Sequence, residues 1–249
     1  MNHFNIEING LPVKAVYTQD NIDNIFIPLL KRLTKIQKEK GGRILVMLAA
    51  PPGAGKSTLS CFLEHLSETT EGIKSISAIG MDGFHRYQDY LLTHTLVRND
   101  VEIPMVDVKG TPETFDLPLF LERVKKVANG EECGWPVYDR LKHNPQENAI
   151  TVTGDIVLLE GNYLLLKDDG WNELKKYADY TIKIMANEDA LRKRLVDRKI
   201  MCGNDFDKAV KFVDFSDMYN VRLCLNQSTD ADLTLMLNAD DSYEMIDFF

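Results

Sequence analysis

The sequence predicts one α/β domain over residues 1–249, built on a doubly wound, mainly parallel β-sheet with flanking helices. Short apolar runs alternate with longer helix-like segments, which is the pattern of strands joined by crossover helices. Ala50, Asp82 and Glu160 each stand where one of the apolar runs ends. Because sites in such sheets lie at the carboxyl ends of strands, we expect the functional residues near these positions.

The N-terminal segment, residues 1–18, predicts a β-hairpin. Residues 4–8 alternate with period two, Asn9-Gly10 follows, and the alternation then resumes. Asn-Gly between two such runs favours a type I′ turn. A helix is expected over about 22–40, because Gly41-Gly42 ends its pattern.

Apolar runs and cap residues assign the remaining elements. Residues 97–115 are expected to be irregular, residues 135–140 to form a loop or a short strand, and a short C-terminal segment to close the chain. Strands are expected over 44–50, 75–80, 155–160, 180–185 and 233–237, and helices over 57–69, 116–129, 187–200 and 205–225.

Residues 51–58 read Pro-Pro-Gly-Ala-Gly-Lys-Ser-Thr and follow the first predicted sheet strand. This is a Walker A loop in its strand–loop–helix context, so the fold is expected to be of the P-loop NTPase type. Glycines let backbone N–H groups approach a polyphosphate, and the helix N-terminus adds a positive dipole end. Lys56 is expected to reach the β- and γ-phosphates of ATP, and the Ser57 hydroxyl to bind Mg²⁺. The predicted nucleotide contacts of the loop are Pro52, Gly53, Ala54, Gly55, Lys56, Ser57 and Thr58.

Asp82 begins the run Asp-Gly-Phe-His after the predicted strand 75–80. A carboxylate at this point can take a proton from a hydroxyl that attacks the γ-phosphate, or it can position Mg²⁺. The alternative is that Asp-Gly only makes a turn. His85 and Arg86, on the same loop, either contact the substrate or are merely solvated.

Glu160 ends the apolar run of residues 156–159. A single carboxylate in this place suits a Mg²⁺-bound water or a substrate contact better than the activation of a hydrolytic water. The alternative is a strand-end carboxylate that faces solvent.

Residues 187–203 predict a small helical lid that begins at the cap residue Asn187. Arg194 and Arg198 lie four residues apart on this helix, and an anion between them would relieve their repulsion. A lid that closes on the transferring phosphates stabilises charge and excludes water. The alternative is a solvated basic face. The cations of the helix are Arg192, Lys193, Arg194, Arg198 and Lys199, with Glu188, Asp189 and Asp197 as acidic neighbours.

The composition speaks against several functional classes. The net charge of −9 and the pI of about 5.1 argue against nucleic acid or an anionic membrane as a partner. No apolar run reaches the roughly 18 residues that cross a bilayer, and no signal peptide is recognised. The four cysteines lack paired spacing, so we expect reduced thiols in a cytoplasmic protein and no zinc site.

Five short motifs stand in order along the chain. They are Gly53-Ala54-Gly55-Lys56-Ser57, Asp82-Gly83-Phe84-His85, Pro112-Glu113-Thr114-Phe115-Asp116, Tyr138-Asp139-Arg140 with His143, and Glu160-Gly161-Asn162. Together they resemble the phosphoribulokinase/uridine kinase/pantothenate kinase family of P-loop kinases, over about residues 43–235. Within this family the chain is most similar to a bacterial branch labelled fructose-kinase-like or nucleoside triphosphate hydrolase-like.

The resemblance implies transfer of a phosphoryl group from ATP to an alcohol with the help of Mg²⁺. Asp82 falls at the position of the family's catalytic base. Tyr138 and His143 fall where uridine kinases contact the nucleoside, and Asn220 resembles a position near the adenine.

One departure from the family concerns the acceptor. Uridine kinases place an Asp, which binds the ribose hydroxyls, two residues before the proline that is Pro112 here. This chain has Gly110 in that place, and its Lys109-Gly110-Thr111-Pro112 looks more like the version in pantothenate kinases. The departure speaks against a nucleoside acceptor.

We therefore expect an ATP- and Mg²⁺-dependent kinase of a small hydroxyl-bearing metabolite, a sugar or a pantothenate-like alcohol. A uridine/cytidine-type nucleoside kinase is one alternative, a non-catalytic ATP-binding regulator is another, and the sequence leaves a homodimer open. Catalysis is assigned to Asp82, Lys56, Arg194 and Arg198, the metal to Ser57 and Glu160, the acceptor to His85, Tyr138, Arg140, His143 and Glu160, and a further nucleotide contact to Asn220.

Overall fold

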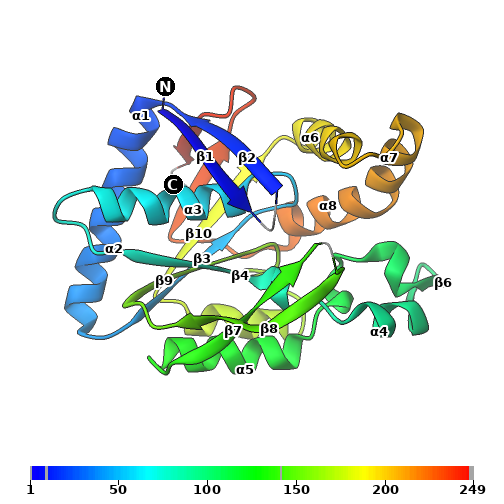
Figure 1. The fold of residues 1–249 in the computed structure, drawn as a ribbon, viewed down its shortest axis with the longest axis horizontal. Coiled ribbons are helices and arrows are strands. Elements are labelled where there is room, and N and C mark those ends of the chain that lie inside the picture. Colours follow the sequence, from blue (N-terminus) through cyan, green and yellow to red (C-terminus); the bar gives the residue numbers. More distant parts are fainter. Residues whose placement is uncertain (1, 9–10, 141, 247–249) are drawn as a thin grey trace.

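The computed structural model describes residues 2–8, 11–140 and 142–246 (Figure 1). Its centre is a six-stranded sheet in the order β12-β11-β10-β3-β9-β4. Every neighbouring pair is parallel except β11 and β12. The predicted α/β fold with a mainly parallel sheet is confirmed. The strands are β3 (Ile44–Ala49), β4 (Ile76–Gly80), β9 (Ile156–Gly161), β10 (Tyr180–Ala186), β11 (Leu233–Leu237) and β12 (Tyr243–Ile246).

The central strand β3 is buried along its whole length and separates two hydrophobic cores. Ile44, Val46 and Leu48 belong to one core, while the residues between them belong to the other. A strand that is covered on both faces needs an unbroken apolar run, which is what the sequence shows. The sheet is therefore doubly wound.

The helices include those predicted from periodicity and capping. Asn187 caps α6, since its side chain accepts hydrogen bonds from the backbone of Asp189 and Ala190. Two π-helical segments, Ile22–Phe26 and Val213–Asp217, join α1 to α2 and α7 to α8. The helices are α1 (Gln19–Asn21), α2 (Ile27–Lys40), α3 (Lys56–Thr69), α4 (Gln88–Thr93), α5 (Leu117–Ala128), α6 (Glu188–Met201), α7 (Phe206–Phe212) and α8 (Met218–Gln227).

The N-terminal hairpin forms as predicted, from β1 (Asn2–Ile8) and β2 (Leu11–Tyr17) in antiparallel pairing. Its predicted type I′ turn at Asn9-Gly10 lies outside the described residues. Phe4 packs edge-on against Phe62 of α3, with ring centres 5.2 Å apart. The hairpin thus covers the helix that follows the phosphate loop.

Residues 97–115 are not irregular as predicted. They contain most of a hairpin, β5 (Thr95–Arg98) and β6 (Val101–Pro104), followed by 3₁₀ turns at Met105–Val108 and Pro112–Thr114. Asn99 and Asp100 make its turn with φ of +52° and +61°, a conformation that Asn and Asp tolerate. In Figure 1 this arm lies on the same side of the molecule as the helices α6 and α7.

Residues 135–139 belong to a longer strand, β7 (Cys133–Asp139), which pairs with β8 (Asn144–Val152), and Arg140 begins the turn that follows. The strand β8 was not predicted because most of its side chains are exposed and show no apolar alternation. The C-terminal segment is a strand, β12. No helix in the described part of the chain is long and apolar enough to span a membrane.

Candidate active site

Three neighbouring strands, β3, β9 and β4, end at the same edge of the sheet. The phosphate loop follows β3, and a 3₁₀ turn at Met81–Phe84, which carries Asp82, follows β4. Glu160 on β9 pairs in register with Leu48 on one side and Gly80 on the other. The predicted strand-end positions therefore lie side by side.

The phosphate loop has the backbone that its glycines allow. Gly53 and Gly55 have φ of +83° and +76°. A Cβ on Gly53 would lie 3.1 Å from the Leu195 side chain of α6, so this glycine lets the loop pack against that helix. Gly55 precedes α3, whose first N–H groups receive no side-chain cap. Free N–H groups at the start of a helix suit a bound phosphate.

Ser57 and Glu160, the predicted metal residues, are in direct contact. The Ser57 hydroxyl donates a hydrogen bond of 2.7 Å to Glu160 Oε1. The other carboxylate oxygen, Oε2, is buried and has no partner in the described structure. Burial raises the pKa of Glu160. A Cβ on Gly80 would lie 3.0 Å from Oε1, so a glycine at position 80 makes room for the carboxylate.

This donor set fits a hard cation. Mg²⁺ prefers oxygen ligands and is usually held by one or two carboxylates together with phosphate oxygens. The Ser57 hydroxyl and the unpartnered Oε2 of Glu160 are such ligands beside the phosphate loop. Both residues therefore fit a Mg²⁺ ion that is shared with a nucleotide.

Asp82 lies among positively charged side chains. Burial raises its pKa, but the charges of Lys56, Arg140 and Arg198 contribute to lowering it more, so the pKa of Asp82 is below its usual value. The carboxylate is therefore ionised at neutral pH and able to accept a proton. The structure thus brings Asp82 together with the predicted Lys56 and with one of the two predicted lid arginines.

Gly83 connects Asp82 to the strand β7. A Cβ on Gly83 would lie 2.0 Å from the carbonyl oxygen of Pro136, so no other residue fits without displacing the backbone. This close packing places Asp82 and Tyr138 on one cavity of about 190 Å³, which Ser57 and Glu160 also line. The structural need for glycine at positions 80 and 83 was not predicted, because the groups that crowd them come from other strands.

His85 and Tyr138, predicted to contact the acceptor, also lie together. The His85 ring stacks on Phe115 with a centre-to-centre distance of 4.0 Å and lies 5.3 Å from the Tyr138 ring. Burial lowers the pKa of His85 to about 4, so the ring is neutral at neutral pH. Its buried Nδ1 has no partner among the described residues.

Arg140 and His143 both lie in the turn between β7 and β8. Arg140 is exposed, and its charge acts to lower the pKa of both Asp82 and Glu160. His143 is exposed with φ of +53°. His143 contacts Lys109 through its backbone, since its carbonyl accepts a hydrogen bond of 3.1 Å from Lys109 Nζ.

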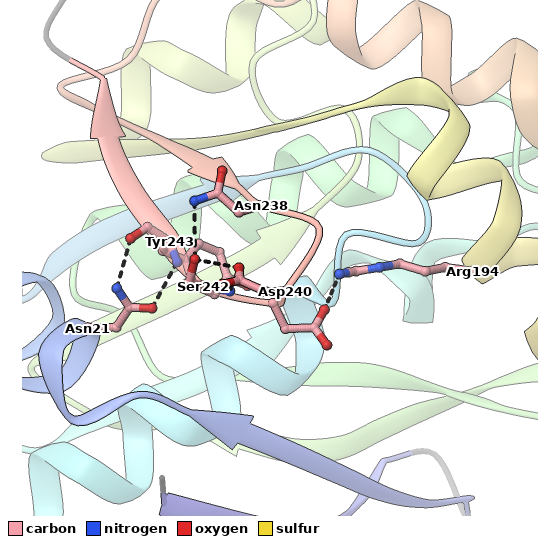
Figure 2. Close-up of polar contacts among 7 residues, drawn as sticks. Asn21, Arg194, Asn238, Asp240, Ser242 and Tyr243 are labelled. Atoms are coloured by element: carbon pink, nitrogen blue, oxygen red, sulfur yellow. Dashed lines mark hydrogen bonds and ion pairs between the residues drawn. The ribbon is translucent and has the colours of Figure 1, made fainter.

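The two lid arginines do not share one neighbourhood. Arg194 forms an ion pair with Asp241, in the turn between β11 and β12 (Figure 2). Arg198 acts on Asp82 instead. In this structure the two side chains therefore act on different carboxylates, and an anion between them stays a prediction.

Asn220 is buried on α8, with Oδ1 unpartnered in the described structure. Its Nδ2 lies 3.7 Å from the place where a Cβ on Gly110 would stand. Gly110 itself has φ of +107°, and its carbonyl accepts a hydrogen bond from the Tyr163 hydroxyl. Asn220 is thus beside the segment that the sequence associates with the acceptor. Lys109 and Tyr163 were not predicted as site residues, since only their contacts across the fold mark them.

The match of this chain to a protein family covers most of its length. A family profile described as "Phosphoribulokinase / Uridine kinase family" matches residues 45–237. The chain belongs to this family. Its fold is that of the P-loop kinases, and the family implies a phosphotransferase that uses ATP, usually with Mg²⁺, and acts on a small molecule.

Two relatives and one solved structure illustrate the family match. The chain is 39% identical over 239 residues to "Uncharacterized protein YggC" of Escherichia coli (strain K12), covering 96% of this chain and 97% of that protein. It is 30% identical over 227 residues to a "Putative uridine kinase" of Schizosaccharomyces pombe, covering 88% and 91%. A "putative fructose transport system kinase" from Silicibacter sp. TM1040 superposes with a TM-score of 0.72 at 31% identity, covering 82% of this chain and 98% of that chain.

Proposed function

We propose that this chain transfers the γ-phosphoryl group of ATP to a hydroxyl of a small metabolite, a sugar or a pantothenate-like acid alcohol. The observation that carries the proposal is the position of Asp82. Its ionised carboxylate lies close to the phosphate-loop Lys56 and lines the same cavity as Ser57 and Glu160. A regulator that only binds ATP has no need of a carboxylate beside the γ-phosphate position.

In the proposed reaction the acceptor hydroxyl binds at Asp82. The hydroxyl oxygen attacks the γ-phosphorus, the bond between that phosphorus and the ADP oxygen breaks, and the proton passes to the Asp82 carboxylate. Lys56 and Arg198 face the developing charge. The low pKa of Asp82 suits a group that orients the hydroxyl and takes its proton late.

Ser57 and Glu160 would hold Mg²⁺, which neutralises charge on the phosphates when it is bound. The helix α6 acts as the lid in this proposal. Its packing against Gly53 of the phosphate loop supports the role, because a movement of the helix would directly change the surroundings of a nucleotide bound at that loop.

The acceptor preference rests on Gly110. The left-handed φ of +107° is one that residues other than glycine rarely adopt. Because the Tyr163 hydroxyl also holds the Gly110 carbonyl, a ribose-binding Asp at this position would be strained. A site without that carboxylate cannot select a ribose diol strongly. A nucleoside kinase remains the second candidate function, because one relative is described as a putative uridine kinase.

The test is ADP release from MgATP with a panel of alcohols: fructose and related sugars, pantothenate, uridine and cytidine. We expect a sugar or an acid alcohol to have the highest kcat/KM. A uridine value about tenfold or more above the others would establish the nucleoside alternative instead. Nucleotide binding without turnover of any compound in a broad metabolite screen would favour the ATP-binding regulator.

A further inference from the structure

Lys109 is a half-buried cation on the acceptor side that the proposed reaction leaves unused. Its Nζ donates hydrogen bonds to Gln88 Oε1 at 3.0 Å and to the carbonyl of His143 at 3.1 Å. The same atom lies 4.8 Å from the centre of the Tyr138 ring. All three partners are uncharged. Within the described part of the chain no carboxylate pairs with Lys109, and burial lowers its pKa to about 8.

The backbone that carries Lys109 is held firmly. The next residue, Gly110, donates its N–H to Thr114 Oγ1 at 3.0 Å and accepts from the Tyr163 hydroxyl through its carbonyl. The preceding Val108 and the following Thr111 are fully buried. Lys109 is therefore a positioned charge, and it lies over the ring of Tyr138, whose side chain also lines the cavity of Asp82.

Several cations surround the carboxylate of Asp82, although the chain as a whole carries −9. Lys56, Arg140 and Arg198 all act on Asp82. Neither these three cations nor Lys109 forms an ion pair with any carboxylate of the described residues. A half-buried cation such as Lys109, on which no carboxylate acts, is unfavourable unless a ligand supplies the counter-charge.

MgATP is itself an anion and balances the cations nearest the phosphate loop, Lys56 and Arg198. Lys109 lies on the other side, where its charge acts on His85. His85 is neutral and does not supply a counter-charge. The remaining positive charge therefore lies where the acceptor is expected to bind.

We propose that the acceptor alcohol carries an anionic group, a carboxylate or a phosphate, and that Lys109 binds this group while the hydroxyl is held at Asp82. The inference rests on the kinase activity proposed above. A charge-assisted contact to a positioned ammonium is strong. An uncharged analogue leaves the cation unpaired, so the site discriminates against it.

The experiment compares matched acceptors that differ only in the anionic group: pantothenate and pantothenol, glycerate and glycerol, fructose 6-phosphate and fructose. For at least one pair the charged member is expected to have a kcat/KM at least about tenfold higher. The carboxylate and phosphate pairs show which anion is preferred. Faster turnover of the neutral member in every active pair would overturn the inference.

Variants of Lys109 separate charge recognition from a merely structural role. Lys109→Met is expected to reduce the charged-to-neutral ratio by about tenfold, and Lys109→Arg to restore most of it. Gln88→Met removes a hydrogen bond of Lys109 and keeps the charge, so the ratio is expected to stay high. Lys38→Met, an exposed lysine on α2, is the control for surface charge. An equal loss for charged and neutral acceptors in Lys109→Met would make Lys109 a structural residue only.

A binding measurement decides the matter if none of these acceptors turns over. The protein is saturated with Mg²⁺ and a non-hydrolysable ATP analogue, which fills the γ-phosphate position, and is titrated with inorganic phosphate at constant ionic strength. We expect saturable binding that weakens at least about tenfold in Lys109→Met. Absence of saturable binding, or equal binding by the variant, overturns the inference. Failure of the proposed kinase function is distinct, because MgATP would then give no thermal shift or no acceptor of any charge would release ADP.

Discussion

Arg194 of helix α6 pairs with Asp241, which lies in the turn between the last two strands (Figure 2). Asp241 has φ of +67°, and hydrogen bonds within the turn hold this backbone. Ser242 Oγ donates to Asp240 Oδ1 at 2.6 Å, and Asn238 Nδ2 donates to Ser242 Oγ at 3.1 Å. The middle of α6 is thus fastened to the last hairpin, while Arg198, one turn further along, acts on Asp82.

This separation predicts different kinetics for the two arginines. Arg198→Ala is expected to lower kcat by about 10²–10³-fold, because a charge aimed at the transferring phosphoryl group matters most in the transition state. Arg194→Ala is expected to lower kcat far less. The measurement is kcat and the ATP Kd for each variant with the same acceptor. Equal losses of kcat would show that the arginines act as a pair, as first expected from their spacing.

Lys56→Ala is expected to abolish transfer without unfolding the protein, since Lys56 lies at the surface start of α3 and outside both hydrophobic cores. A ligand stabilises a protein only in proportion to its binding, so the thermal shift given by MgATP is expected to be largely lost. The melting temperature without nucleotide and the variant Lys38→Ala serve as controls. Normal turnover in Lys56→Ala would contradict the phosphate-loop assignment.

Asp82→Asn is expected to keep nucleotide binding and to lose about 10²–10⁴-fold in kcat, the usual contribution of a positioned base. The amide retains the shape of the carboxylate but cannot take the proton. Single-turnover rates and the ATP Kd check this, with Asp89→Asn on the exposed side of α4 as the control. A loss of less than about tenfold would remove Asp82 from the role of base.

The pH dependence of anionic acceptors is expected to report on Lys109. Its pKa of about 8 means that the side chain is cationic below this pH and neutral above it. The groups facing it, His85 and Tyr138, have pKa values of about 4 and about 12 and do not titrate near pH 8. The kcat/KM of a charged acceptor should therefore fall as the pH rises through about 8. In Lys109→Arg this fall should disappear, because arginine stays charged.

Asn21 ties the first helical segment to the last strand (Figure 2). Its Nδ2 donates to the carbonyl of Tyr243, and its Oδ1 accepts from the N–H of Tyr243, both at 2.8 Å. Asn21→Ala would leave two buried backbone groups without partners, and each is expected to lower the free energy of unfolding by about 1–3 kcal/mol. Each kcal/mol lowers the melting temperature by about 2–4 °C in a domain of this size.

The control for Asn21 is Asn24→Ala. Asn24 also makes a side-chain hydrogen bond, to Asp20 at 2.7 Å, but it is exposed on the adjacent turn. Its loss is expected to change the melting temperature little, because water replaces the bond. Similar changes in the melting temperature of both variants would mean that the buried contact with Tyr243 stabilises the protein no more than an exposed hydrogen bond does.

The sequence by itself determined the features that depend on local structure. An apolar run predicts the strand β3, and the glycines of the Walker A motif predict a loop whose backbone adopts left-handed φ angles. Cap chemistry predicts that Asn187 begins α6. The N-terminal hairpin also follows from period-two alternation. These features can be predicted without knowledge of tertiary contacts, because they depend on dihedral preference and on which face of one element is buried.

Only the tertiary structure decided which of the predicted residues meet. Ser57 and Glu160 are 103 residues apart and share a hydrogen bond, because β3 and β9 happen to be adjacent strands. Arg194 and Arg198 look equivalent in the sequence, yet the direction of each side chain depends on what packs beside α6. Lys109 is positioned by Gln88 on α4 and by His143 in the turn between β7 and β8. Contacts of this kind depend on how whole elements pack, and the sequence pattern within one segment does not predict that packing.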